Sequence, residues 1–491
     1  MSDNSKTTSN FNQAFWLGFG QLCTFALSFV SAAILSRYFD KTEYGTYKQI
    51  LYVYTTLSTL FTVGLPSVFA YFIPRLNTGQ QKTMITALNR LFLLLGALFS
   101  ITLFVLSGPI ASLLHNPELE TGLKIFSPFP LFTLPAMGVE GIYTALRKTR
   151  TIAIYNVVSK LFMLICIVVP VVLFHTGYKE AIIGWGVASF LIFLLAMYLK
   201  NRPYCHIKKE LVEDFYKQVF DYCLPLVGAF VAGFFISSAD QFFISRFWGT
   251  ETFAEASNGC MSIPIAGMIS SSVRAVLLPL FSKADAQGEM AQAVQTYNRA
   301  VSKCVVLVFP ILLFCIFFAK DIMIFFYGEQ YANSGAYLQI FTIRDFIGCL
   351  PYFSVLMAIG YTKFYMNMHF IGVLYIWITD YIFAQLGLPP TMFVAVSSSF
   401  QVGSAILAYL FIHKKTGIQL LNKTVISSII RVALHCSIVL TLLLCLSSLI
   451  KFKLPLLVSI GIMGALYYLV LVLTSKIVHV DYLESIKLLR Q

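Results

Sequence analysis

The sequence is poor in charge and lacks the common signatures of soluble catalysis. Asp, Glu, Lys and Arg make up only 12% of the 491 residues, whereas a soluble domain carries about 25%. No His-Glu-x-x-His metal motif and no Gly-x-x-x-x-Gly-Lys-Ser/Thr nucleotide loop occurs. The seven His are dispersed, and the ten Cys stand without the spacing of a metal site. The sequence therefore predicts no ATP hydrolysis, no catalytic residue and no resident metal or cofactor.

What the chain has instead is apolar length. Hydrophobic residues make up 58% of it, which is more than a soluble core can hide, so lipid is the expected solvent. The expected fold is an all-α polytopic membrane protein of about 14 transmembrane helices, since each span needs about 20 mostly apolar residues. The candidate segments lie near 14–37, 48–72, 86–107, 122–145, 151–174, 180–199, 219–246, 256–281, 302–319, 334–357, 365–386, 391–412, 425–449 and 455–474.

Basic residues segregate to alternate gaps between these segments. The net charge is +13, and most Lys and Arg fall in every second gap, whereas the gaps at 115–120 and 249–255 carry Glu. Cytoplasmic loops carry an excess of Lys and Arg, so we expect both termini in the cytoplasm. The longest gaps, 200–218 and 282–301, leave no room for a soluble catalytic domain.

A short pattern recurs in the two halves of the chain. Ser36-Arg37 and two aromatic residues end the first segment, and Ser245-Arg246 and two aromatic residues end the seventh. Chance similarity of short apolar segments is the alternative explanation. The spacing of six helices favours duplication, and an even number keeps both copies in one orientation. The pattern therefore predicts a parallel repeat about an axis along the membrane normal.

This repeat predicts three parts of the chain. They are an N-lobe of six helices at 1–200, a C-lobe of six helices at 201–424, and a C-terminal helix pair with a cytoplasmic tail at 425–491. Two-lobed bundles of this kind are suited to alternating access, with the substrate between the lobes.

Several motifs resemble those of bacterial polysaccharide flippases. Leu35-Ser36-Arg37 followed by Glu43-Tyr44-Gly45 resembles the signature at the end of their first helix. Weaker likenesses continue in order along the whole chain, at 62–66, 237–246, 327–331 and 360–363. The chain is identified as a member of the O-antigen and capsule flippase family within the multidrug/oligosaccharidyl-lipid/polysaccharide exporter superfamily.

The resemblance implies a function and an architecture. Family members flip undecaprenyl-pyrophosphate-linked oligosaccharides to the outer leaflet of the bacterial inner membrane, beside polysaccharide polymerases and glycosyltransferases of the same pathway. Helices one, two, seven and eight would line a central cavity between two six-helix lobes. The usual basic residue of the first lobe is not obvious here, since the core of helix two carries no charge.

Arginines are the candidate substrate-binding residues. A charge at the bilayer centre costs roughly 3 kcal/mol on insertion scales, so such residues face the bundle interior, form pairs or line water. Guanidinium groups match phosphate oxygens bidentately and stay charged. The candidates are Arg37, Arg246, Arg274 and Arg344. Interfacial anchoring is the alternative for Arg37 and Arg246, and an ion pair with Asp240 or Asp345 is the alternative for Arg274.

Intramembrane carboxylates are the candidates for ion coupling. A desolvated carboxylate can exchange a proton or bind Na⁺, which makes Asp240 and Asp345 candidates for H⁺ or Na⁺ coupling; pairing with an Arg is the alternative. Glu140 and Lys160 lie at similar depth on neighbouring helices, and we expect a structural ion pair between them.

Three other functions compete with this prediction. A drug/cation antiporter of the same superfamily should have an acidic, aromatic cavity, whereas this chain offers at least as many Arg as carboxylates at membrane depth. A peptidoglycan-precursor flippase is so close in fold that the sequence separates it poorly. A membrane polymerase or glycosyltransferase usually carries a large external loop, which this sequence lacks.

Overall fold

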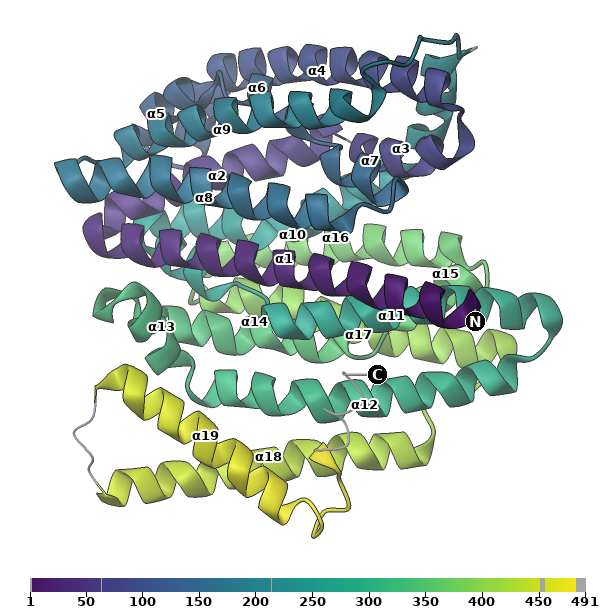
Figure 1. The fold of residues 1–491 in the computed structure, drawn as a ribbon. Coiled ribbons are helices and arrows are strands. Elements are labelled where there is room, and N and C mark those ends of the chain that lie inside the picture. Colours follow the sequence, from purple (N-terminus) through teal and green to yellow (C-terminus); the bar gives the residue numbers. More distant parts are fainter. Residues whose placement is uncertain (1, 63, 213, 451–454, 483–491) are drawn as a thin grey trace. The chain divides into compact units, whose positions relative to one another are not determined.

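The computed structural model describes residues 2–62, 64–212, 214–450 and 455–482, and their regular elements are all helical (Figure 1). The helices of the first half are α1 (Ser2–Tyr38), α2 (Lys41–Thr62), α3 (Leu65–Phe72), α4 (Thr78–Leu113), α5 (Glu118–Phe126), α6 (Pro130–Ala136), α7 (Val139–Ala145), α8 (Thr149–Phe174), α9 (Tyr178–Asn201) and α10 (Phe215–Gly259). Those of the second half are α11 (Pro264–Gln287), α12 (Met290–Phe317), α13 (Ala319–Tyr327), α14 (Ser334–Gly348), α15 (Tyr352–Ala358), α16 (Thr362–Gln385), α17 (Thr391–Thr416), α18 (Lys423–Ile450) and α19 (Leu456–Thr474). The chain forms two compact units, Met1–Ala254 and Glu255–Gln491.

The expected all-α membrane fold is confirmed. Within the described ranges, nine helices are long and apolar enough to cross a membrane, and twelve spans result if each of three bent helix pairs counts as one. The two further segments of the expected fourteen correspond to α10 and α16, which form long helices outside that set. The count of fourteen therefore stays a prediction, as do the lobe boundaries at residues 200 and 424.

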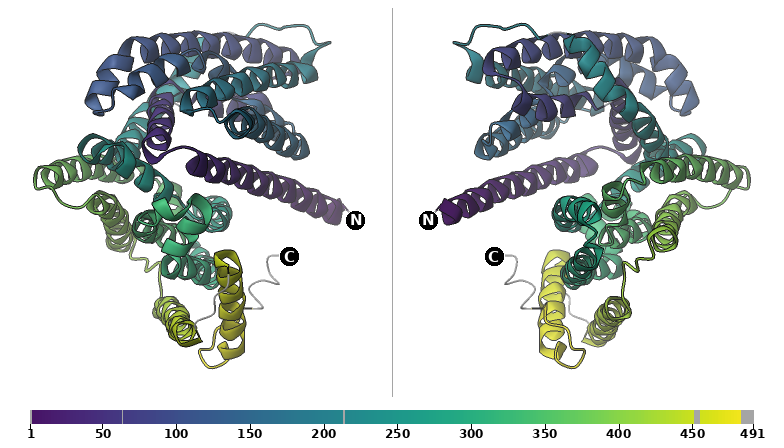
Figure 2. Two further views of the ribbon diagram at one scale, coloured as in Figure 1. Left: turned by 90° about the vertical axis from the view of Figure 1, so that its left-hand side faces the viewer. Right: turned by 90° about the vertical axis from the view of Figure 1, so that its right-hand side faces the viewer.

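Each unit is a bundle of neighbouring helices. In the first unit α1 packs along α8, α8 packs against α9, and α4 packs against α5 and α6. In the second unit α12 contacts α11, α14 and α18, while α14 and α16 both pack on α17. The C-terminal helices α18 and α19 pack on each other, and α18 also packs on α12 (Figure 2).

One apolar segment of the first unit, from α5 to α7, is interrupted twice. The segment bends by 51° between α5 and α6. Further along, Gly138 between α6 and α7 has a φ of +92°, a conformation that favours glycine. Pro135 lies just before this break and cannot donate a backbone hydrogen bond. The interruption leaves backbone groups at membrane depth that other residues must satisfy.

A buried lysine satisfies one of these groups. The Lys200 side chain is 0% exposed, although lysine is almost never fully buried without a partner. Its Nζ donates hydrogen bonds to the carbonyl oxygen of Pro135 at 2.7 Å and to Asn89 Oδ1 at 3.0 Å. It also lies over the Phe69 and Phe92 rings, 5.0 and 5.7 Å from their centroids. Lys200 thus fixes the broken helix between α4 and α9.

A close seam joins α2 to α10 within the first unit. Gln49 Nε2 donates to Ser245 Oγ at 2.7 Å, and Gln49 Oε1 accepts from Asn116 Nδ2 at 2.6 Å. Tyr52 donates to the carbonyl oxygen of Ser238 at 3.0 Å. Both Gln49 and Ser245 are fully buried, so this polar network is satisfied internally, as buried polar groups must be.

Candidate functional site

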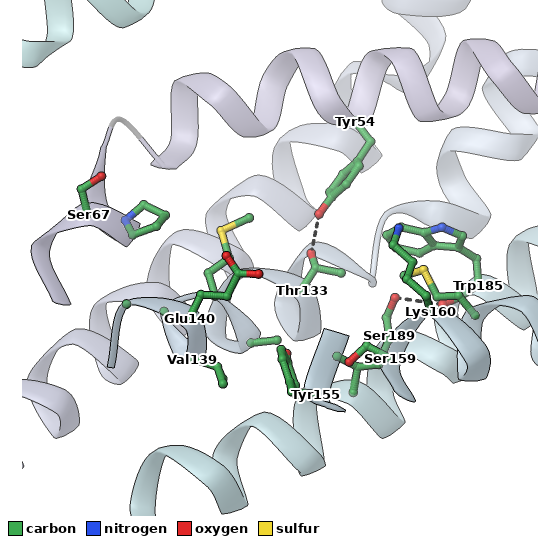
Figure 3. A pocket seen from close by; sticks show the side chains of 17 residues that line it. Tyr54, Ser67, Thr133, Val139, Glu140, Tyr155, Ser159, Lys160, Trp185 and Ser189 are labelled. Carbon is green, nitrogen blue, oxygen red and sulfur yellow. Dashed lines mark hydrogen bonds between the residues drawn. The ribbon is translucent and has the colours of Figure 1, made fainter. Parts of the chain in front are cut away.

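A cavity of the first unit lies beside the interrupted segment α5–α7. It has a volume of about 530 Å³, within the range of about 300–1,000 Å³ typical of small-molecule sites. We call it the Glu140 cavity (Figure 3). It is lined by Tyr54, Pro66, Ser67, Thr133, Ala136, Met137, Gly138, Val139, Glu140, Gly141, Tyr155, Ser159, Lys160, Met163, Trp185, Ser189 and Ile192.

The helix break forms one wall of the Glu140 cavity. Residues 136–141, on either side of Gly138, all line it. A larger residue at position 141 would clash with Phe69, since a Cβ at Gly141 would lie 2.9 Å from Phe69 Cβ. Because Lys200 holds the carbonyl oxygen of Pro135, the position of this wall depends on a residue that does not itself line the cavity.

The opposite wall is aromatic and held in place. The Trp185 indole is 9% exposed and packs against Tyr54 and Phe126, with ring centroids 5.5 and 4.9 Å apart. The Tyr54 hydroxyl donates to Thr133 Oγ1 at 2.8 Å (Figure 3). A preorganised wall costs less ordering free energy when a ligand binds.

The cavity carries one charge of each sign. Figure 3 shows Glu140 and Lys160 toward opposite ends of the cavity. The Glu140 carboxylate accepts a hydrogen bond from Asn156 Nδ2 at 2.5 Å. Lys160 has neither a hydrogen bond nor an ion pair with any residue that the structure describes. The structure thus brings the two expected partners to one cavity, while their direct pairing stays a prediction.

A second, smaller cavity adjoins the first. It has a volume of about 170 Å³ and is lined by residues of α1, α2, α8 and α9, among them Lys48; we call it the Lys48 cavity. Lys160, Met163 and Trp185 line both cavities. The Lys48 ammonium lies 5.3 Å from the centroid of the Tyr44 ring and forms no ion pair with an acidic residue of the described ranges. Lys48 and Lys160 therefore line two adjoining cavities of the first unit.

The candidate residues of the first unit lie apart from these cavities. Arg37 is exposed in the last turn of α1. Arg246 donates from Nη1 to the carbonyl oxygen of Leu113 at 2.5 Å, and its own carbonyl oxygen contacts His115 Nδ1 at 3.0 Å. Asp240 is 6% exposed on α10. None of the three lines the Glu140 or the Lys48 cavity, and their expected roles stay predictions.

Two candidate residues of the second unit, Arg344 and Asp345, form hydrogen bonds within that unit. Arg344 donates to the hydroxyl groups of Ser397 and Ser398 and lies over the Phe341 ring at 4.3 Å. Asp345 Oδ2 accepts a hydrogen bond at 2.7 Å from the backbone of Ile263, which caps α11. A carboxylate at a helix N-terminus stabilises the helix, so this structural role competes with ion coupling.

The third candidate residue of the second unit is Arg274. It is half-buried on α11, and no hydrogen bond or ion pair joins it to another residue of the described ranges. An Arg without a partner at membrane depth is available to an anionic ligand. Its expected role in substrate binding stays a prediction.

Sequence reasoning missed Lys48 and Trp185. Lys48 falls at the predicted start of the second apolar segment, where a Lys looks like an interfacial residue. Trp185 stands within an apolar run and looks like packing. The signal that joins them to Lys160 is the packing of α1, α2, α8 and α9 around one space, which sequence spacing does not reveal.

Solved structures of known transporters share this fold. The structure is similar to a lipid II flippase, MurJ, in an inward closed conformation, with a TM-score of 0.67 and 15% identity, covering 96% of this chain and 99% of that one. It is also similar to an outward-facing multidrug resistance MATE family transporter of the MOP superfamily, with a TM-score of 0.57 and 12% identity over 83% of this chain and 95% of that one. At these identities the likeness establishes the fold.

Sequence comparison adds the family. The succinoglycan biosynthesis transport protein ExoT of Rhizobium meliloti (strain 1021) is 24% identical over 376 residues, which are 73% of this chain and 70% of that protein. The model of a family described as polysaccharide biosynthesis protein matches residues 34–336, more than half of the chain. The chain is therefore a multi-pass membrane protein that belongs to the polysaccharide biosynthesis protein family.

Proposed function

We propose that this protein is a flippase that moves an undecaprenyl-pyrophosphate-linked oligosaccharide from the cytoplasmic to the outer leaflet of a bacterial inner membrane. The observation that carries the proposal is the pair Lys48 and Lys160, which line two adjoining cavities among apolar helices. An ammonium group at membrane depth is costly unless it meets an anion or water. A lipid-linked pyrophosphate is an anion that a polysaccharide-biosynthesis protein of this fold would encounter.

The same proposal includes a transport cycle and an orientation. Two six-helix lobes, 1–200 and 201–424, would alternate access to a site between them, with both termini in the cytoplasm. Arg274 of the second unit is a separate candidate for binding the anionic substrate through its guanidinium fork. Asp240 remains a candidate for H⁺ or Na⁺ coupling, and polymerases and glycosyltransferases of the same pathway are the proposed partners. The proposal treats the chain as a transporter without catalytic residues.

Two related functions serve as the alternatives. The ExoT relative is named a transport protein of succinoglycan biosynthesis, which favours a polysaccharide substrate over a peptidoglycan precursor. The second alternative is a drug/cation antiporter, because the fold is similar to that of MATE transporters. Cation binding favours carboxylates and aromatic rings without competing ammonium groups, and the two lysines of the adjoining cavities argue against it.

Complementation of a deletion strain tests the proposed function. Lys48→Gln combined with Lys160→Gln removes both charges while keeping polar side chains of similar length. Surface polysaccharide should fall at least tenfold, since two charge-assisted contacts are worth about 1.5–3 kcal/mol each, while the protein stays at normal abundance in the membrane. Lys179→Gln is the matched control, because Lys179 forms an exposed ion pair with Glu118 outside both cavities. Normal export by the double variant at normal abundance would remove these lysines from the mechanism.

A further inference from the structure

We infer that the Glu140 cavity binds a neutral sugar residue, the one that follows the pyrophosphate of the transported lipid. This inference rests on the proposed function and assigns the larger of the two adjoining cavities. Its evidence is the wall of the cavity and the balance of its charges (Figure 3), together with the three lining residues that the cavity shares with the Lys48 cavity.

The wall combines aromatic faces with hydroxyl groups. Trp185, Tyr54 and Tyr155 supply flat apolar surfaces, and Ser67, Thr133, Ser159 and Ser189 supply hydroxyl groups. A sugar ring has the matching surface, with an apolar C–H face that packs on aromatic rings and hydroxyl groups around its edge. Mostly apolar walls with a few placed polar groups are the usual form of a small-molecule site.

One hydroxyl group of this wall awaits a partner. Ser159 Oγ is buried and interacts with the Tyr155 hydroxyl, but it makes no hydrogen bond of good geometry with the residues that the structure describes. A buried polar atom without a partner costs about 1–3 kcal/mol. A sugar hydroxyl in the cavity would supply that hydrogen bond.

The charges of the cavity favour a neutral ligand. Glu140 and Lys160 lie toward opposite ends of the cavity, and their formal charges cancel. An organic cation would meet the ammonium of Lys160 without a second carboxylate, and a free anion would meet the Glu140 carboxylate. A neutral polyol can donate a hydroxyl hydrogen to Glu140 and accept a hydrogen from Lys160.

The residues shared by the two cavities indicate which part of the ligand would occupy each cavity. Lys160, Met163 and Trp185 belong to both walls, so a ligand that extends through both passes Lys160 in the middle. In a lipid-linked oligosaccharide the first sugar is bonded directly to the pyrophosphate. With the pyrophosphate between Lys48 and Lys160, that sugar would lie against Trp185 and reach toward Glu140.

Tryptophan fluorescence of the purified full chain tests the inference. The protein has four Trp residues, and replacing Trp16, Trp248 and Trp377 with Phe leaves Trp185 as the only indole. The probes are the methyl glycosides of glucose, galactose and N-acetylglucosamine, each titrated into the millimolar range. We expect at least one to change the Trp185 emission with saturation.

Substitutions in the cavity sharpen this test. Glu140→Gln should weaken that binding by roughly tenfold to a hundredfold, because a charge-assisted hydrogen bond is lost. Ser159→Ala, which should disturb folding less than Glu140→Gln does, should weaken glycoside binding by severalfold. Glu180→Gln is the control, since Glu180 lies in the same unit but outside the cavity.

Three results would overturn the sugar assignment. They are the absence of a saturable change for every glycoside, binding that is unaffected by both cavity variants, and stronger saturable binding of the cation tetraphenylphosphonium than of any glycoside. The export assay with the lysine variants is independent of this titration. If glycosides bind at Trp185 but export is normal in the double lysine variant, only the proposed function is refuted. If export falls in the double lysine variant but no glycoside binds, only the assignment of this cavity is refuted.

Discussion

Gly45 provides a demanding test of the seam between α2 and α10. A Cβ added at Gly45 would lie 2.3 Å from the carbonyl oxygen of Thr250 and 2.7 Å from its Cγ2. Backbone atoms cannot turn away as a long side chain can, so Gly45→Ala must push the two helices apart by about 1 Å to restore ordinary contact.

The cost follows from the contacts that this separation weakens. Gln49 lies one turn further along the same face of α2, and its 2.7 Å hydrogen bond to Ser245 would lengthen. Overpacking costs about 1–3 kcal/mol and the buried hydrogen bond about 1 kcal/mol. The better helix propensity of Ala returns about 1 kcal/mol, so a net loss of about 1–3 kcal/mol is expected.

Thermal unfolding in detergent measures this effect against a matched glycine. Gly403 lies within α17, and a Cβ there would meet no atom within 4 Å. Gly403→Ala should leave Tm unchanged or raise it, whereas Gly45→Ala should lower it. If both variants unfold at the same temperature as the unmodified protein, the close seam between α2 and α10 is wrong.

Substitutions at two further residues test the roles of single side chains. Lys200→Met keeps the apolar stem but leaves the Pro135 carbonyl and the Asn89 amide oxygen without their donor, so Tm should fall by an amount equivalent to about 1–3 kcal/mol; an unchanged Tm would refute the role of Lys200 at the helix break. Arg274→Ala should abolish surface polysaccharide at normal membrane abundance, and Arg274→Lys should restore it only in part because the planar fork is lost. Full export by Arg274→Ala would exclude Arg274 from substrate binding.

Labelling tests the proposed orientation. Lys209 lies in a gap that the distribution of basic residues places in the cytoplasm. In a background without native Cys, Lys209→Cys should react with an impermeant maleimide only after the membrane is opened. Labelling of Lys209→Cys from the outside of intact cells would show that the chain has the opposite orientation to the one proposed.

The fold class could be predicted because it depends on composition and length. Apolar runs of spanning length dictate helices when lipid is the solvent, and twelve of the fourteen expected segments correspond to candidate spans if bent pairs are counted once. The break at Gly138 was not predicted, since a Gly within an apolar run is also compatible with a continuous helix. The superposition of 1–200 on 201–424 stays a prediction.

The candidate site could be predicted only in part. Glu140 and Lys160 were expected to meet because their helices are neighbours, and the structure places both at one cavity. Lys48 and Trp185 were missed because their meeting depends on how α2 and α9 pack around α8. Ser36-Arg37 and Ser245-Arg246 share a pattern, yet Ser36 bonds to its own helix while Ser245 accepts from Gln49. Similar motifs thus acquire different contacts through tertiary packing.

Transbilayer movement in vesicles tests the central claim most directly. The purified protein is reconstituted with an undecaprenyl-pyrophosphate oligosaccharide that carries a nitrobenzoxadiazole label on its sugar, and dithionite bleaches only the label in the outer leaflet. With the protein present, the inner-leaflet label should also become bleachable, and Lys48→Gln with Lys160→Gln should slow this step at least tenfold. The same bleaching with and without protein, in vesicles where it still transports an organic cation, would contradict the flippase assignment.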